Sequence, residues 1–134
     1  MAGYSKTPLV KKLGFKPEMK VTFLDAPDSY LGIIQELPAG CAVSYEIGQQ
    51  QDLVHLFARN IQALESRIVP ARNCISTQGA LWISWPKKSS SLYLDLDGNI
   101  VRELGLGAGL VDIKVCAIDD IWSALKFVYR VRDR

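Results

Sequence analysis

The stretch LVDIKVCAIDDIWSALKFVYRV, residues 110–131, decides which fold this sequence predicts. Residues 110–117 are rich in β-branched side chains and residues 123–131 in Phe, Val and Tyr, so both segments predict strands. A turn at Asp119 and Asp120 separates them. A helix beginning at Asp120 fits the second segment almost as well, because three apolar side chains share one helical face, namely Ile121, Leu125 and Val128. We favour the strand, and two strands joined by so short a turn predict an antiparallel hairpin.

Upstream of the hairpin, predicted strands and helices alternate. Apolar and β-branched runs predict strands at 20–24, 41–45, 53–58 and 80–85. Cap residues followed by helically spaced apolar side chains predict helices at 8–13, 29–36, 60–69 and 97–104. This alternation predicts a parallel sheet covered by helices. With the hairpin added, we expect an α/β fold, a single Rossmann-like three-layer sandwich whose mostly parallel sheet ends in an antiparallel hairpin.

One connection strains this layout. Only about six residues join the predicted strand at 41–45 to the strand at 53–58, whereas a parallel crossover normally takes about a dozen or more. Six extended residues reach about 20 Å, just enough to run back along a short strand. The two strands are therefore either parallel or an antiparallel pair.

Length and composition describe one globular domain. The chain has 134 residues, 49% of them hydrophobic, 22% charged, and a net charge of +2. We expect a single α/β domain over 1–134, with residues 1–16 as an N-terminal arm and short helix. The balanced charge disfavours disorder and a polybasic nucleic-acid module. A domain of this size holds a core but leaves little chain for the insertions that usually build a substrate pocket.

Cysteine usage and hydropathy indicate a reduced compartment. Cys41, Cys74 and Cys116 are widely spaced and odd in number, which predicts three buried thiols rather than a disulfide framework or a zinc site. The first twelve residues hold no apolar signal-peptide region, and no apolar run approaches the ~20 residues of a membrane helix. We expect a cytoplasmic protein without membrane contact.

Three stretches together carry a family resemblance: residues 2–14, the motif Trp85-Pro86-Lys87-Lys88, and residues 101–127. The combination resembles a small bacterial family catalogued as domain of unknown function 3052. That resemblance implies a short α/β protein with no established activity, and it brings no catalytic residues. The expected sheet layout is also similar to that of class I methyltransferases, which is an analogy of fold alone.

A methyltransferase needs a glycine-rich turn after the first strand, so that the backbone can approach S-adenosylmethionine. Here that turn is Asp25-Ala26-Pro27-Asp28-Ser29, which holds no glycine, and Pro27 offers no backbone donor. Glu46, at the end of the second strand, is placed to hold ribose hydroxyls. We therefore predict no cofactor and keep S-adenosylmethionine as an alternative.

The remaining chemical candidates have ordinary structural interpretations. Gly105, Gly107 and Gly109 follow a helix and open a strand, the reverse of a phosphate loop, and predict helix caps. His55 lies in the most apolar strand and predicts a hydrogen-bonded core histidine, with a general base as the alternative. The carboxylate pairs predict a helix cap at Asp95/Asp97 and a turn at Asp119/Asp120. No metal site is expected.

The segment after the 80–85 strand has the residue types most typical of a ligand-binding site. Lys87 and Lys88 could meet an anion, and Trp85 could offer a stacking face at a strand end where open α/β sheets bind ligands. Lys114 and Lys126 either widen this patch or decorate an edge strand. The arginines at the C-terminal end predict a solvated tail: Arg130, Arg132 and Arg134.

These observations favour a non-catalytic cytoplasmic binding or interaction domain with a degenerate methyltransferase-like fold. Its partner would be an unknown protein or a small anionic ligand, and whether it is an enzyme stays open. The alternatives are a divergent S-adenosylmethionine-dependent methyltransferase, and a weak RNA or anion binder using Lys87, Lys88, Lys114 and Lys126. No catalytic residue is predicted. The predicted binding residues are Asp25, Glu46, Trp85, Lys87, Lys88 and Lys126.

Overall fold

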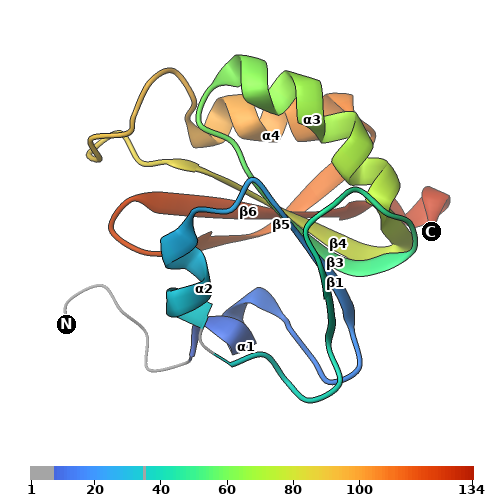
Figure 1. The fold of residues 1–134 in the computed structure, drawn as a ribbon. Coiled ribbons are helices and arrows are strands. Elements are labelled where there is room, and N and C mark those ends of the chain that lie inside the picture. The colour runs from blue at the N-terminus through green and yellow to red at the C-terminus, as the bar shows by residue number, and fades with distance from the viewer. Residues whose placement is uncertain (1–7, 35) are drawn as a thin grey trace.

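A computed structural model describes residues 8–34 and 36–134, and these form one six-stranded sheet with helices on both faces (Figure 1). Of the predicted arm and short helix at residues 1–16, residues 1–7 lie outside the described residues. The strands are β1 (Lys20–Leu24), β2 (Ala42–Ser44), β3 (Gln51–Phe57), β4 (Ile75–Pro86), β5 (Leu110–Ala117) and β6 (Trp122–Tyr129). The helices are α1 (Leu9–Leu13), α2 (Asp28–Ile34), α3 (Ile61–Cys74) and α4 (Gly98–Gly107), with a 3-10 turn at Val131–Asp133.

The strand order is β2-β1-β3-β4-β6-β5. The neighbours β2, β1, β3 and β4 are parallel, and β6 is antiparallel to both β4 and β5. The mostly parallel α/β sheet with a C-terminal hairpin is thus confirmed, and the last segment is a strand rather than the alternative helix. β2 and β3 are not a hairpin, because both run parallel to β1 and lie on either side of it, joined by residues 45–50.

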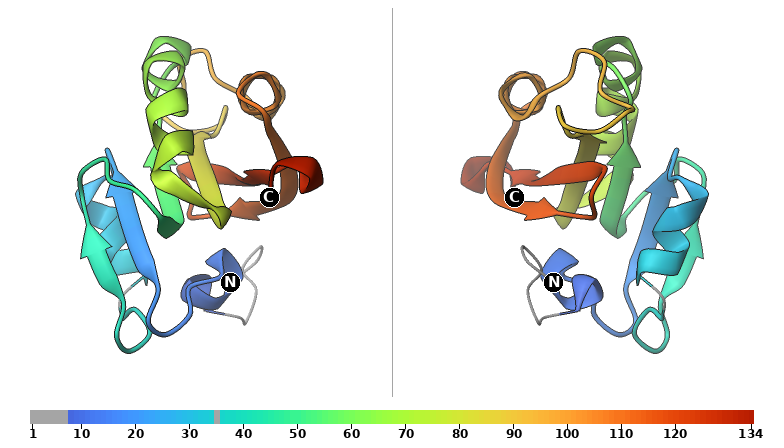
Figure 2. Two further views of the ribbon diagram at one scale, coloured as in Figure 1. Left: turned by 90° about the vertical axis from the view of Figure 1, so that its right-hand side faces the viewer. Right: turned by 90° about the vertical axis from the view of Figure 1, so that its left-hand side faces the viewer.

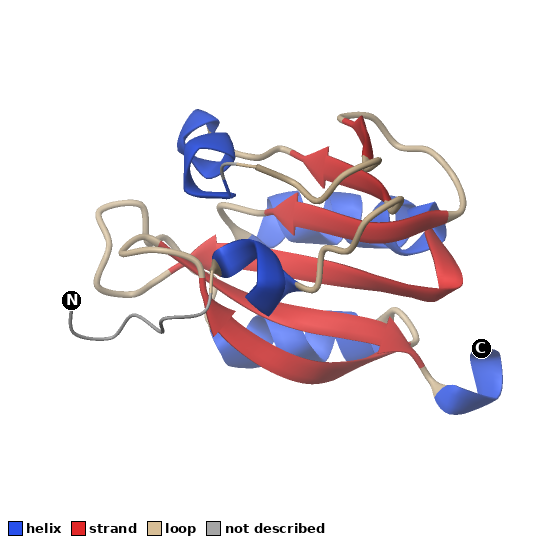
Figure 3. Ribbon diagram, turned by 90° about the horizontal axis from the view of Figure 1, so that it is seen from below, coloured by secondary structure: helices blue, strands red, loops and turns tan. Residues whose placement is uncertain are grey.

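The helices make the outer two layers of a three-layer sandwich. Figure 2 shows α3 and α4 on one side of the sheet and α1 and α2 on the other. Figure 3 shows α1 lying across one sheet face, with the longer helices behind the sheet. Alternate side chains of each strand enter one of two cores, one under each helix pair. Trp82 fixes α1, since its indole Nε1–H donates to the Leu13 carbonyl at 2.8 Å.

Three local predictions are corrected. Helix α3 does not end near residue 69 but continues through Pro70 to Cys74, because Ala71 and Cys74 bury their side chains in the core and tertiary packing outweighs the proline. Gly105 and Gly107 lie inside α4, and only Gly109, at φ +89°, takes the left-handed conformation. Of the three free thiols, Cys74 and Cys116 are buried, whereas Cys41 is partly exposed beside the short edge strand β2.

No helix among the described residues is long and apolar enough to cross a bilayer.

Candidate functional site

The sheet has a topological switch point between β1 and β3. From β1 the chain crosses to β2 on one side, and β3 then lies on the other side of β1. In open α/β sheets, ligands bind in the crevice outside the carboxyl ends of the strands at such a point. The candidate site is therefore the turn after β1 and the chain that leaves β2 and β3.

A pocket of about 230 Å³ opens at this edge of the sheet. The turn after β1 supplies most of its wall, and Tyr45, the first residue beyond β2, supplies an aromatic ring that is 59% exposed. The Tyr45 ring lies 6.1 Å from the buried ring of Phe23, centroid to centroid. The residues that line the pocket are Phe23, Asp25, Ala26, Pro27, Asp28 and Tyr45.

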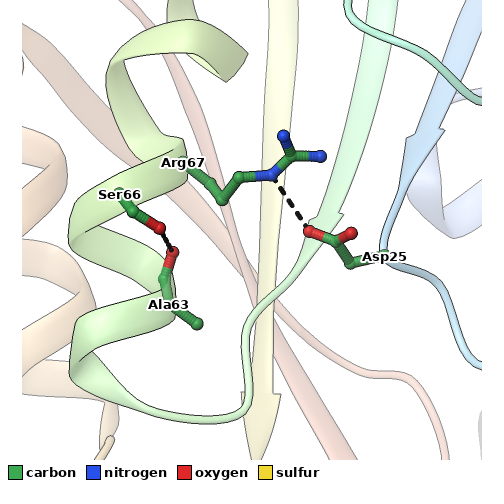
Figure 4. Close-up of polar contacts among 4 residues, drawn as sticks. All are labelled: Asp25, Ala63, Ser66 and Arg67. Carbon is green, nitrogen blue, oxygen red and sulfur yellow. Dashed lines mark hydrogen bonds and ion pairs between the residues drawn. The ribbon is translucent and has the colours of Figure 1, made fainter.

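Asp25 ends β1 in an uncommon backbone conformation. Its φ is +58°, in the left-handed region where aspartate is tolerated better than most side chains. Its carboxylate Oδ2 lies 3.1 Å from Nε of Arg67 on α3, and both side chains remain partly exposed (Figure 4). A strained residue carrying a charged pair is a frequent property of functional sites.

Behind the pocket, α2 and the sheet share a buried hydrogen-bond chain. The Tyr30 hydroxyl lies 2.7 Å from Nδ1 of His55, and His55 Nε2 lies 2.6 Å from Oγ of Ser84. Burial lowers the pKa of His55 to about 3, so the imidazole is neutral. Burial, followed by the charge of Cys116, raises the pKa of Tyr30. His55 is thus a hydrogen-bonded core residue, shielded from any ligand.

The predicted binding residues fall into separate places. Asp25 and Glu46 lie at the carboxyl ends of the neighbouring strands β1 and β2, and Glu46 is exposed. Trp85 is only 8% exposed and belongs to the core under α3 and α4, so it offers no stacking face. Lys87 donates from Nζ to the Asp119 carbonyl at 2.6 Å.

The other lysines are directed elsewhere. Lys88 lies 3.9 Å from Asp97, the N-cap of α4. Lys126 is half-buried over the Trp82 ring, on the sheet face under α1. Its pKa is lowered mainly by burial and further by the positive charges of Lys114 and Lys16. Lys114 pairs across the hairpin with Lys126 and donates to the Lys12 carbonyl at 3.0 Å. The four lysines therefore do not form the single patch that the sequence suggested.

Two residues of the site were missed by the sequence analysis. Tyr45 stands immediately before Glu46, and its place at a strand end was the available signal. Arg67 is 42 residues from Asp25, and its approach depends on how α3 rotates over the sheet. No pattern in the sequence distinguishes Arg67 from the other arginines.

Solved structures share this fold. A TehB-like S-adenosylmethionine-dependent methyltransferase from Corynebacterium glutamicum is 8% identical, with a TM-score of 0.56 over 96% of this chain and 91% of that chain. The fibrillarin pre-rRNA processing protein of Methanococcus jannaschii is 12% identical, with a TM-score of 0.61 over 95% and 70%. A methyltransferase of the same cofactor class from Aquifex aeolicus is 11% identical, with a TM-score of 0.58 over 89% and 86%. No family model and no curated protein sequence matches the chain.

At identities of 8% to 12% these matches show the fold. The methyltransferase-like sheet is confirmed, whereas the resemblance to domain of unknown function 3052 gains no family match. The prediction of a non-catalytic binding domain is wrong as the leading interpretation, because several neighbours are named as S-adenosylmethionine-dependent methyltransferases and favour the alternative. The prediction of no cofactor loses its support for the same reason.

Proposed function

We propose that this protein is a divergent S-adenosylmethionine-dependent methyltransferase that binds its cofactor at the carboxyl ends of β1 and β2. The observation that carries the proposal is the pocket after β1, since it lies at the switch point of a sheet with the methyltransferase strand layout. When bound, the cofactor supplies an activated methyl group on a positively charged sulfur.

The side chains at the pocket suit the nucleoside part of such a cofactor. Tyr45 offers an exposed ring for stacking on adenine, a contact worth about 1–3 kcal/mol in comparable base–aromatic pairs. Glu46 follows directly and can accept hydrogen bonds from ribose hydroxyls. The pocket volume of about 230 Å³ is below the roughly 300 Å³ at which ligand pockets usually begin. It therefore suits part of the cofactor, and the open crevice must take the rest.

The turn after β1 fits the cofactor in a manner different from a glycine-rich loop. Asp25 adopts a positive φ that glycine would adopt more easily, and Pro27 removes one backbone donor. Side chains should therefore contribute more to cofactor binding here than they do beside a glycine-rich loop. The acidic residues Asp25, Asp28 and Glu46 favour a ligand that carries a positive charge.

Cofactor binding is tested by isothermal titration calorimetry with S-adenosylmethionine and S-adenosylhomocysteine. We expect Tyr45→Ala to weaken both by about 5- to 150-fold, the equivalent of losing one stacked base. Tyr93→Ala is the matched control, because Tyr93 is an exposed tyrosine outside this pocket. No binding at millimolar ligand, or equal losses in the two variants, would refute the proposed site.

Methyl transfer is tested separately with methyl-tritiated S-adenosylmethionine and a cell extract separated into protein, nucleic-acid and small-molecule fractions. We expect label in one fraction with the wild-type protein and much less with Tyr45→Ala. Binding without any incorporation of label would reduce the proposal to cofactor binding and refute the transferase activity.

A further inference from the structure

Arg67 uses only one of its nitrogens in the contact with Asp25. Nε lies 3.1 Å from Asp25 Oδ2, and no other hydrogen bond or ion pair of Arg67 occurs within residues 8–34 and 36–134. Figure 4 shows the two terminal nitrogens beyond the Asp25 contact. The Arg67 side chain is 36% exposed, and its partner Asp25 is one of the residues that line the pocket after β1.

A guanidinium holds its five donors in one plane, and two of them can bind both oxygens of a carboxylate. Because Asp25 holds Nε, it restricts the directions in which the terminal nitrogens can point. Asp25 therefore positions a two-donor edge for a second carboxylate. In the same turn Pro27 has no N–H, and without glycine the side chains hinder a close approach of a ligand to the remaining backbone donors.

The charges around the turn leave Arg67 as the group suited to an anion. Asp28 and Glu46 would repel a carboxylate. Of the two basic residues that follow β3 and β4, Lys87 binds the Asp119 carbonyl and Arg59 lies over the Trp122 ring at 5.5 Å, whereas Arg67 is held beside the turn by Asp25. A ligand with both a cationic and a carboxylate group is matched by this mixture of acids and one arginine.

We propose that Arg67 binds the α-carboxylate of an amino-acid-bearing nucleoside ligand, and that Asp25 is its positioning residue. This inference rests on the proposed function, because the ligand class is that of the cofactor and its demethylated product. The proposal gives a side chain of α3 a part in ligand recognition that a glycine-rich turn would supply through its backbone amides.

The test compares two nucleosides by isothermal titration calorimetry. S-adenosylhomocysteine carries the α-carboxylate, and 5′-methylthioadenosine is a similar thioether without the amino-acid group. We expect the wild-type protein to bind S-adenosylhomocysteine more tightly. Arg67→Gln should weaken S-adenosylhomocysteine at least tenfold and leave 5′-methylthioadenosine within twofold, and Arg67→Lys should fall between, because it keeps the charge without the planar pair of donors.

Two further variants separate an effect on carboxylate binding from a general effect on the fold. Arg102→Gln removes an ion pair of the same geometry, because Arg102 Nε on α4 lies 3.1 Å from Asp112 Oδ1 on β5, the edge strand at the opposite end of the sheet from β2. This variant should leave both affinities unchanged. Asp25→Asn should lower the preference for S-adenosylhomocysteine less than Arg67→Gln does. Thermal unfolding of each variant establishes that it is folded.

The outcomes distinguish the two proposals. If the wild-type protein binds neither nucleoside, the proposed function fails and this inference fails with it. If it binds both equally, or if Arg67→Gln weakens both to the same extent, cofactor binding stands and the role of Arg67 is refuted. A selective loss of S-adenosylhomocysteine supports the assignment.

Discussion

His55 makes the stability of this protein depend on pH. The imidazole is fully buried and hydrogen-bonded to Tyr30 and Ser84. Its pKa in the folded protein is about 3, against an ordinary value of 6.5. Between these pH values the unfolded chain binds a proton that the folded chain does not. The stability contributed by neutral His55 is therefore complete above pH 6.5 and is lost as the pH falls toward 3.

The size of the effect follows from the two pKa values. The free energy of unfolding should fall by about 1.4 kcal/mol for each pH unit between them. From pH 7 to pH 5 the His55 contribution is about 2 kcal/mol, a large part of the stability of a small domain. Carboxylates also titrate at low pH, so the effect must be measured as a difference from a variant that lacks the imidazole.

Urea unfolding is followed by the fluorescence of Trp82, Trp85 and Trp122, all buried in the folded state. The wild-type protein should lose about 2 kcal/mol more than His55→Gln between pH 7 and pH 5. Because the chain has one histidine, NMR offers an independent measurement, and the His55 ring protons should not titrate between pH 8 and pH 5. Equal losses in the two proteins, or a ring titration near pH 6.5, would contradict this account.

Two further predictions concern α4. A Cβ at Gly105 would overlap the buried ring of Phe127, so Gly105→Ala should destabilise by about 1–3 kcal/mol, whereas Gly107→Ala, with open space around it, should stabilise by up to about 1 kcal/mol. Similar changes of melting temperature in the two variants would contradict this. Asp97 Oδ1 accepts from the Ile100 amide at 3.0 Å, so Asp97→Ala should cost about 1 kcal/mol in urea unfolding, and the exposed control Asp133→Ala should cost little.

The sheet was predictable because its signals are local. The β-branched run at Leu110–Ala117 coincides with β5, and the apolar run near residues 53–58 lies in β3, a central strand buried on both faces. The direction of β2 was not predictable, since the six-residue connection allowed either orientation. It was decided by pairing with β1, whose residues Lys20 to Thr22 lie beside β2.

The site was predictable only in part. Strand ends identify Asp25 and Glu46, because the carboxyl edge of a parallel sheet follows from the order of elements. Side-chain direction does not follow from it. Trp85 turns into the core and Lys87 binds the Asp119 carbonyl in the β5–β6 turn, so residue types suited to a ligand are used for packing and for holding a turn.

The short connection between β2 and β3 explains why side chains dominate the candidate site. Where a crossover helix would stand, residues 45–50 form only a loop, and Tyr45 and Glu46 remain exposed at its start. The turn at Asp25 also lacks the glycines that let a backbone approach a ligand closely. In the proposed function, recognition depends on a few separable side chains, above all Tyr45 and Arg67. Removing a side chain tests each of them directly, which a site built from backbone amides would not allow.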